Sequence, residues 1–338
     1  LASADPDLEV LARLLAQGAS DCIVSTLPDP DLVRRLMDKT EFDRLAAAHR
    51  LPVPRTFAPT SLAEVRDASE RLRFPAIVKP ATPQAWCQSP GLPEAVRRAK
   101  ALRVDHVDEL MALCAQLLPL GATSLVQEFI EGPDEEHFDV HAFIGRDGRV
   151  QAVFSGRKWR IWPPHAGSGC LVESLNEPRL EALALDILAR IGYRGIANMN
   201  FKRDCRTGEF LLLEINPRVS QWGILTTRCG VNLPWLAWRD AQGLPAPDPA
   251  PPVRAGRWYV NGLKDLRAVR QYRAEGLTRW SDYLRSLLRW PLVCQTLSLD
   301  DPRPALVLTS RWIARKMRAS RQSPRRRPAE DPQTPRHP

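Results

Sequence analysis

The sequence predicts a fold of mixed helices and strands, centred on a hairpin in its second half. Residues 196–202 and 209–215 have the apolar patterns of strands, and the polar, Gly-terminated stretch 204–208 between them predicts a tight turn. A second hairpin is predicted from residues 137 to 155, across a turn at 145–148. Amphipathic patterns predict helices, at 30–50, 106–118 and 177–191.

The first half of the chain carries further local signals. Two elements are predicted before residue 30, a helix at 8–16 and a strand at 21–25. Asp29 is the expected N-cap of the next helix, with Pro30 at its first position. Ser61 begins another helix, and Glu64 three residues later completes a capping box. Short strands are predicted at 74–80, 100–104 and 124–130.

Two stretches read as loops, and packed helices are expected after them. Residues 81–93 contain three Pro, one Gly and Trp86, and residues 156–170 are rich in charge and Trp. Beyond residue 218 the apolar, Trp-rich sequence predicts packed helices, and the Pro-rich stretch 245–252 predicts a linker.

The composition is that of an ordinary globular protein. Of the 338 residues, 44% are apolar and 26% are charged, no apolar run approaches the roughly 18–20 residues that cross a bilayer, and no signal-peptide pattern opens the chain. The seven cysteines are scattered without metal-binding spacing, which indicates reduced thiols rather than a zinc site or disulfides. These features predict a cytoplasmic protein.

Positive charge is concentrated at the end of the chain. The formal net charge is +9, and residues 311–338 hold nine Lys or Arg against two Asp or Glu, a net +7. The body is therefore near neutral, and no specific nucleic-acid partner is predicted. A weak contact of this tail with a membrane or another polyanion is the alternative to a solvated, disordered end.

The end of the central hairpin carries oxygen ligands and a cation. Glu214 and Asn216 are two residues apart on one strand and therefore point to the same face, and Asn200 on the partner strand is expected opposite them. Carboxylate and amide oxygens suit Mg²⁺, and the guanidinium of Arg218 suits a carboxylate or phosphate. The alternative is an ordinary hairpin whose polar end is a solvated turn.

Two lysines and an acidic segment are further candidates. Lys79 closes a buried apolar strand, from which its ammonium can reach a phosphate, and Lys39 lies in a predicted helix. A solvated surface charge is the alternative for each. Backbone groups at residues 128–130 could read an adenine edge and Glu135 could accept from ribose hydroxyls, unless the acidic segment 131–136 is only a solvated turn.

Five segments occur in an order that resembles the ATP-grasp superfamily, namely DKTEF, FPAIVKP, QEFIEGPDEE, NFKRD and EINPR. The resemblance covers about residues 30–240 and is nearest in style to carboxylate–amine ligases, carbamoyl phosphate synthetase and biotin carboxylase. It implies an α+β ATP-grasp fold, in which two α+β lobes clasp ATP between antiparallel sheets. The expected divisions are a truncated N-terminal α/β portion at 1–30, an ATP-grasp domain at 31–243 with lobes at about 55–125 and 126–243, a Pro-rich linker at 244–256, a helical extension at 257–317 and a disordered basic tail at 318–338.

The resemblance also implies a role for each candidate residue. Lys39 and Lys79 are the expected contacts of the nucleotide phosphates, and Lys79 and Arg218 are the expected catalytic cations. The adenine pocket and the ribose contact would come from Glu128, Phe129, Ile130 and Glu135 or Glu136. The metal ligands for Mg²⁺, with Mn²⁺ as an alternative ion, would be Glu214, Asn216 and Asn200. Asn200 departs from the family pattern, which usually places Glu or Gln there.

A cluster of cations in the second predicted loop is the candidate substrate contact. Arg157, Lys158 and Arg160 lie there with Trp159 and Trp162, at a position that faces the acceptor in the resembled fold. Cations at that position suit an anionic carboxylate. The alternative is an exposed basic loop over packed indoles.

The implied activity is that of a ligase. A substrate carboxylate would attack the γ-phosphate of ATP, and an amine would displace phosphate from the acyl phosphate, with positioning and charge neutralisation as the main contributions of the protein. Small-molecule carboxylate and amine substrates are the expected partners, and a homodimer is a further expectation. The alternatives are a catalytically weak ATP-binding sensor or scaffold, which the glycine-poor stretch 81–93 favours, and a protein that acts through its basic tail.

Overall fold

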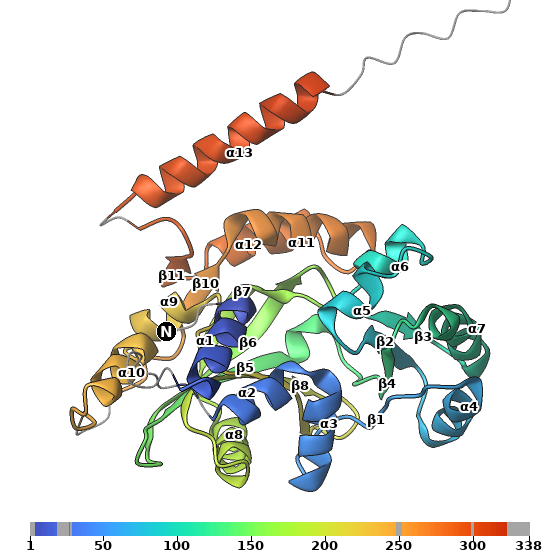
Figure 1. Cartoon of the computed structure of the whole chain (residues 1–338). Coiled ribbons are helices and arrows are strands. Elements are labelled where there is room, and N and C mark those ends of the chain that lie inside the picture. Colours follow the sequence, from blue (N-terminus) through green and yellow to red (C-terminus); the bar gives the residue numbers. More distant parts are fainter. Residues whose placement is uncertain (1–3, 19–26, 28, 248–251, 299–300, 323–338) are drawn as a thin grey trace, which may run out of the picture. The chain divides into compact units, whose positions relative to one another are not determined.

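The computed structural model describes residues 4–18, 27, 29–247, 252–298 and 301–322 (Figure 1). They fall into two units, one up to Gln295 and one from Thr296 onward, which are described separately. The strand expected at 21–25 lies outside the described residues. None of the described helices combines the length and the apolar composition that a bilayer crossing requires.

The N-terminal segment forms three helices. They are α1 (Asp5–Ala16), α2 (Pro30–Met37) and α3 (Lys39–Ala48). The single helix expected at 30–50 is therefore wrong, because the chain stops and restarts at Asp38. The Asp38 carboxylate accepts from the backbone N–H groups of Thr40 and Glu41 at 2.8 and 3.0 Å, which makes it the N-cap of α3. This restart places Lys39 at the first position of a new helix.

Within the described residues the strands form two sheets, one of four and one of seven strands. The smaller sheet has the order β1-β4-β2-β3 and antiparallel pairing. Its strands are β1 (Thr56–Phe57), β2 (Ala76–Pro80), β3 (Leu102–Val104) and β4 (Ser124–Glu128). The helices α4 (Leu62–Arg71) and α7 (Val107–Leu117) cover it (Figure 1). Side chains such as Val65, Leu110 and Val126 are buried between the helices and the sheet.

The stretch expected to be a loop at 81–93 contains a short helix. This is α5 (Pro83–Cys87), and α6 (Glu94–Arg98) follows it. Trp86 is 1% exposed and donates its indole N–H to Ser124 Oγ at 2.9 Å. The burial of this one large side chain holds the segment against the sheet. The N-cap predicted at Ser61 is confirmed, because its hydroxyl accepts from the Glu64 N–H.

The larger sheet has the order β11-β10-β7-β6-β5-β8-β9 and is antiparallel except at the β10–β11 edge. Its strands are β5 (His137–Ile144), β6 (Val150–Trp162), β7 (Ser168–Leu175), β8 (Gly195–Arg203), β9 (Phe210–Asn216), β10 (Trp258–Val260) and β11 (Leu292–Cys294). The short 3₁₀ helices η2 (Leu118–Leu120) and η3 (Asp134–Glu136) flank β4. Both predicted hairpins are confirmed by the β5–β6 and β8–β9 pairs.

The two faces of this sheet have different cores. On one face α8 (Pro178–Arg190) packs with α3 over side chains such as Val140 and Met199. On the other face α9 (Gly223–Arg228) and α10 (Leu233–Ala241) pack over Phe143 and Phe154, with Trp222 between them. Alternation along each strand sends neighbouring residues to opposite faces. Asp139, Asn200 and Glu214 are cross-strand neighbours, so they share one face of the sheet.

The loop expected at 156–170 is wrong. Backbone pairing with β5 and β7 extends β6 to Trp162, so the predicted basic loop is a central strand. The alternating apolar residues of its sequence, Trp159 and Ile161, suit a strand with two paired neighbours. Only residues 163–167 form the turn to β7.

Residues 257–295 extend the larger sheet rather than forming a purely helical segment. β10 pairs antiparallel with β7 and parallel with β11. Between these strands lie α11 (Gly262–Ala274), which packs on β6 and β7, and α12 (Trp280–Leu287). In the second unit α13 (Arg303–Gln322) includes residues 318–322 of the tail expected to be disordered, and 323–338 lie outside the described residues. The expected domain boundaries stay predictions.

Candidate functional site

A cavity of about 810 Å³ lies between the smaller sheet and the end of β9. Its walls come from α1, α2, α3, β2, β4 and β9. Four of the residues predicted from the sequence line it together, namely Lys39, Lys79, Glu214 and Asn216. Segments far apart in the chain are thus brought to one site.

The central hairpin places its polar residues as the strand pattern predicts. Asn200 stands opposite Glu214, and Asn198 stands opposite Asn216. Asn200 Nδ2 donates to Glu214 Oε1 at 2.8 Å, and Asn216 Nδ2 donates to the same oxygen at 3.0 Å. A bulge after Asn200 shifts the register, so that Phe201 pairs with Leu212.

The residues at this end of β9 fit a hard cation. The Glu214 side chain is exposed to the cavity, and its hydrogen-bond partners are two amides. Within the described ranges no group of three or more His, Cys, Asp or Glu suits a metal ion. One carboxylate with amide oxygens suits Mg²⁺, an ion that commonly keeps most of its coordination sphere for water and substrate phosphates.

Two ammonium groups face the same cavity. Lys39 Nζ, on α3, donates to the Pro80 carbonyl oxygen at 2.8 Å, and Lys79 Nζ donates to Gln127 Oε1 at 3.0 Å. Burial and, next, the charge of Lys39 lower the pKa of Lys79 to about 8, although Glu214 and Asp43 partly offset both effects. Burial likewise lowers the pKa of Lys39. A polyanion in the cavity would restore both charges, because it provides the counter-charge that the site lacks.

Arg218 lies at the same end of β9 but has a partner from α1. Its Nε donates to Asp5 Oδ1 at 2.5 Å, and its Nη2 donates to Asn216 Oδ1 at 3.4 Å. The Arg218 side chain is 20% exposed and Asp5 is 58% exposed. The guanidinium is therefore beside the metal-ligand candidates and holds a carboxylate already.

The segment predicted to hold adenine follows β4. The N–H of Glu128 donates to the Arg55 carbonyl oxygen at 2.9 Å, and the N–H of Phe129 donates to Pro75 O at 3.3 Å. A base would therefore not accept from either group. Ile130 is 5% exposed, next in the chain.

The two ribose candidates differ in their surroundings. Glu136 is 6% exposed, and its two oxygens accept from Arg157 and Arg203 at 2.9 and 2.6 Å. Glu135 is half-buried, and its backbone carbonyl accepts from Arg157 Nε. Because both Glu136 oxygens are bonded within the chain, Glu135 is the better placed of the two.

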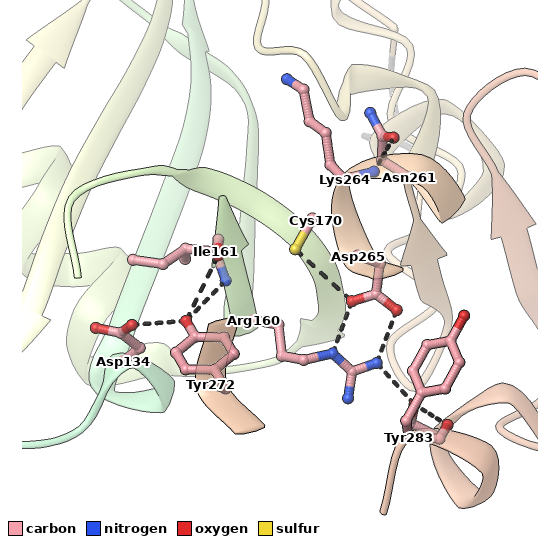
Figure 2. A network of polar contacts seen from close by, with 10 residues as sticks. Asp134, Arg160, Ile161, Cys170, Asn261, Lys264, Asp265, Tyr272 and Tyr283 are labelled. Atoms are coloured by element: carbon pink, nitrogen blue, oxygen red, sulfur yellow. Dashed lines mark hydrogen bonds and ion pairs between the residues drawn. The ribbon is translucent and has the colours of Figure 1, made fainter. Parts of the chain in front are cut away.

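The three predicted substrate cations diverge from one another. Arg157 bonds Glu136, Lys158 bonds Asp139 and Asn200, and Arg160 forms a bidentate pair with Asp265 (Figure 2). Arg157 and Lys158 point to opposite faces of the sheet, because side chains alternate along a strand. The register of β6 shifts after Lys158, and this shift changes the direction of the Arg160 side chain. Only Lys158 points toward Glu214.

Two further lysines near the predicted site residues were missed from the sequence, and neither lines the cavity. Lys202 is buried, its ammonium lies 4.7 Å from the Phe129 ring centroid, and it is two residues after Asn200 on the same face of β8. Lys264, on α11, donates from its Nζ to Oε1 of Gln221 at 2.8 Å, and Gln221 follows shortly after Arg218 in the sequence. Strand alternation could have found Lys202, whereas Lys264 comes from beyond the Pro-rich stretch.

Lysine usage is a further signal. The chain has only seven Lys among its 48 basic residues. The five that are buried or half-buried in the described body are Lys39, Lys79, Lys158, Lys202 and Lys264. Four of them donate to an oxygen of this chain, and the Lys202 ammonium lies over the Phe129 ring.

Comparison with known proteins identifies related sequences. A family model described as "ATP-grasp in the biosynthetic pathway with Ter operon" matches residues 123–261. D-aspartate ligase of Enterococcus faecium is 27% identical over 232 residues, which cover 66% of this chain and 54% of that protein. D-alanine–D-alanine ligase of Xylella fastidiosa is 27% identical, with 60% of this chain and 66% of that protein covered. The large chain of carbamoyl phosphate synthase of Clostridium botulinum is 25% identical over 56% of this chain and 17% of its own length. The chain thus spans about half the length of the D-aspartate ligase and less of the synthase.

Solved structures share the fold. Biotin carboxylase of Campylobacter jejuni superposes with a TM-score of 0.57 at 16% identity, covering 73% of this chain and 55% of that one. The biotin carboxylase domain of Hydrogenobacter thermophilus 2-oxoglutarate carboxylase, solved with MgADP and bicarbonate, gives 0.56 at 14% identity, covering 74% and 54%. The chain therefore has the α+β ATP-grasp fold that its five motifs indicate, and residues 123–261 match the ATP-grasp family model.

Proposed function

We propose that the chain is an ATP- and Mg²⁺-dependent ligase that activates a carboxylate as an acyl phosphate and joins it to an amine. The observation that carries this proposal is the joint position of Lys39, Lys79, Glu214 and Asn216 around one cavity. The similarity to D-aspartate ligase and D-alanine–D-alanine ligase supports carboxylates and amines as the substrate classes.

The two lysines would hold the nucleotide phosphates. Lys39 Nζ and Lys79 Nζ face the cavity from α3 and β2, with hydrogen bonds to one oxygen each in this chain. An ammonium has three donors, so both can also donate to phosphate oxygens. Their lowered pKa values mark charges that are under-compensated without an anion.

Glu214 and Asn216 would hold Mg²⁺, which supplies charge neutralisation between the phosphates when bound. Arg218, at the same end of β9, would stabilise the transferred phosphoryl group through its bidentate guanidinium. This role requires that Asp5 release the guanidinium, and the Asp5 side chain is 58% exposed.

The adenine base would lie along the segment that follows β4. Glu128, Phe129 and Ile130 are proposed to line the adenine pocket, with the Lys202 ammonium over the Phe129 ring at its edge. Glu135 is proposed to accept from the ribose hydroxyls. The substrate carboxylate would be met by Arg218 and by Lys264, which is anchored to Gln221 near the same end of β9.

The test is ADP release from Mg-ATP with a panel of amino acids and other carboxylates. One carboxylate is expected to stimulate release, and Glu214→Gln and Lys79→Ala are expected to lower the stimulated rate by at least about a hundredfold. Glu209→Gln is the matched control, because this carboxylate is 69% exposed at the far end of the same hairpin. Unchanged turnover in both site variants would show that the assignment is wrong.

A nucleotide-binding sensor or scaffold is the second candidate. It is favoured by one observation, that Arg157 and Arg160 are held in internal ion pairs and so are not free for a substrate. ATP binding with no stimulated release by any carboxylate would support it. Deletion of residues 318–338 separates a function of the tail, since loss of vesicle binding with intact ADP release would assign the two to different parts.

A further inference from the structure

Lys158 contacts both Asn200, which lies beside Glu214, and the buried Asp139 in the centre of the larger sheet. From β6 its ammonium reaches Asp139 Oδ1 on β5 at 2.6 Å and Asn200 Oδ1 on β8 at 2.5 Å. The side chains of Lys158 and Asp139 are 6% and 2% exposed. The second oxygen of Asp139 accepts from the Trp222 indole N–H at 3.1 Å. The ammonium is therefore held in a paired, dry position.

The position of Trp222 depends on a missing side chain. A Cβ on Gly156, which pairs with Asp139 across the strands, would lie 2.9 Å from the Trp222 ring and 3.2 Å from the Glu173 carbonyl oxygen. Glycine at this position thus lets the indole close over Asp139. The resulting cover keeps water from the carboxylate that anchors Lys158.

The Lys158 ammonium decides which way the Asn200 amide points. An ammonium only donates, so Asn200 must present its oxygen to Lys158 and its NH₂ group to Glu214. The Asn200 oxygen is then not available to a metal ion. A divalent cation placed at that oxygen would also meet a fixed positive charge at hydrogen-bond distance, with little water to screen it. The Asn216 oxygen differs, because its bond from Arg218 Nη2 is long, at 3.4 Å, and the Arg218 side chain is more exposed than that of Lys158.

We propose that Lys158 is a built-in cation of this site, and that the site consequently holds one divalent ion, on Glu214 and Asn216, with Asn200 outside its ligand set. The inference rests on the proposed nucleotide-dependent function and deepens it. Lys158 acts as a positioning residue, because it orients Asn200 and supplies charge beside Glu214 at any metal concentration. The sequence-based expectation of three metal ligands is replaced by two.

The experiment counts Mn²⁺ bound to the full chain with a non-hydrolysable ATP analogue, from the free-ion signal in electron paramagnetic resonance. We expect one ion per chain. Asn216→Ala should raise the Mn²⁺ dissociation constant at least about tenfold, and Asn200→Ala should change it less than about threefold. Thermal melting verifies that both variants fold.

A gain-of-site variant tests the role of Lys158 directly. Lys158→Met alone leaves Asp139 buried and unpaired, so it is combined with Asp139→Asn, which keeps the sheet neutral. Adding Asn200→Asp, an isosteric change, then sets a second carboxylate beside Glu214. A second Mn²⁺ is expected in the folded triple variant, and Asn200→Asp with Lys158 intact is expected to keep one.

The failures are distinguishable. Two ions in the unmodified protein, with one lost in Asn200→Ala, would overturn the single-ion inference and leave the proposed function standing. A folded triple variant that still binds one ion would overturn the claim that the ammonium excludes the second. No Mn²⁺-dependent nucleotide binding at all would instead overturn the proposed function.

Discussion

Arg160 and Asp265 form a bidentate ion pair that joins β6 to α11, with Nε–Oδ1 and Nη2–Oδ2 distances of 2.6 and 2.8 Å (Figure 2). Asp265 is fully buried and the Arg160 side chain is 11% exposed. The same guanidinium donates to Ser286 Oγ on α12 at 2.7 Å. A second contact of this segment is the Tyr272 hydroxyl, which donates to Asp134 Oδ2 at 2.6 Å. Residues 257–295 are therefore tied to β6 and η3 by buried polar contacts.

The first prediction concerns this ion pair. Arg160→Met leaves the Asp265 carboxylate buried without its partner, so the free energy of unfolding should fall by about 3–5 kcal/mol, as measured by urea denaturation. Adding Asp265→Asn should recover part of the loss. Arg103→Met is the control, because the Arg103–Asp105 pair is more than half exposed and should contribute less than about 1 kcal/mol. Equal losses in the two single variants would contradict a structural role of Arg160.

The second prediction concerns Lys79 and pH. Its pKa of about 8 means that the ammonium is lost as pH rises through 8, so affinity for ADP should fall by about tenfold between pH 7 and 9.5. Lys79→Met should flatten this dependence in a titration with a fluorescent ADP analogue.

The effect of Lys79 on folding stability has the opposite pH dependence to its effect on ADP affinity. Between about pH 8 and the ordinary lysine value of 10.5, the unfolded chain binds the Lys79 proton and the folded chain does not. The contribution of Lys79 to stability should therefore rise with pH over this window, and the rise should be absent in Lys79→Met. Lys100→Met, at an exposed lysine, should keep it.

The third prediction concerns the Asp5–Arg218 pair. Asp5→Asn removes the carboxylate that holds the Arg218 guanidinium. A bound anion then no longer has to displace this carboxylate in order to reach the guanidinium. Because the pair is partly exposed, the gain in affinity for a non-hydrolysable ATP analogue should not exceed about fivefold. Isothermal titration measures it, and Asp186→Asn is the control, because its pair with Arg190 on α8 is about half exposed and Asp186 does not line the cavity. A loss of affinity would indicate that Asp5 orients Arg218 instead of competing for it.

The fourth prediction concerns His141. Its ring stacks on Trp222 with centroids 4.1 Å apart, and neither ring nitrogen has a hydrogen-bond partner within the described residues. Burial, together with the charge of Lys158, lowers its pKa to about 3. Below about pH 6.5 His141 is protonated in the unfolded chain but stays neutral in the folded chain. The free energy of unfolding should therefore fall as pH drops from 6.5 toward 3.

His141→Phe should remove part of that loss. The variant should gain stability relative to the original protein as pH falls from 7 to 4, in urea denaturation at each pH. His137, whose pKa is lowered to about 4, keeps a remaining acid dependence. His106→Phe, at an exposed position, should leave the curve unchanged. A constant difference across pH would contradict the role of His141.

Local patterns predicted much of the hairpin site. The spacing of Glu214 and Asn216 and their position opposite Asn200 follow from the two-residue repeat of a strand, and the register confirms them. The amphipathic pattern over 30–50 does not reveal the break between two helices, where Asp38 serves as an N-cap. Capping depends on which backbone N–H groups lack partners, and that is settled only when α2 ends.

The predicted basic loop shows what a pattern cannot supply. Arg157, Lys158 and Arg160 are close in sequence and chemically alike. The sequence pattern therefore predicts that they form one cationic surface. In the fold they bond to η3, to β5 with β8, and to α11, respectively. Strand alternation and the β6 register shifts send them apart, and their partners lie far along the chain.

The sequence by itself determined the local chemistry of this protein: the hairpin, the oxygen ligands at its end, the lysine that closes β2 and the order of the five motifs. Only the tertiary structure decided which charges are free. It pairs Arg160 with Asp265, turns the Asn200 oxygen to Lys158, and gathers Lys39 and Lys79 around one cavity. The reason is physical, because alternation and capping act over a few residues, whereas a buried charge takes whatever partner the packing of distant elements brings to it.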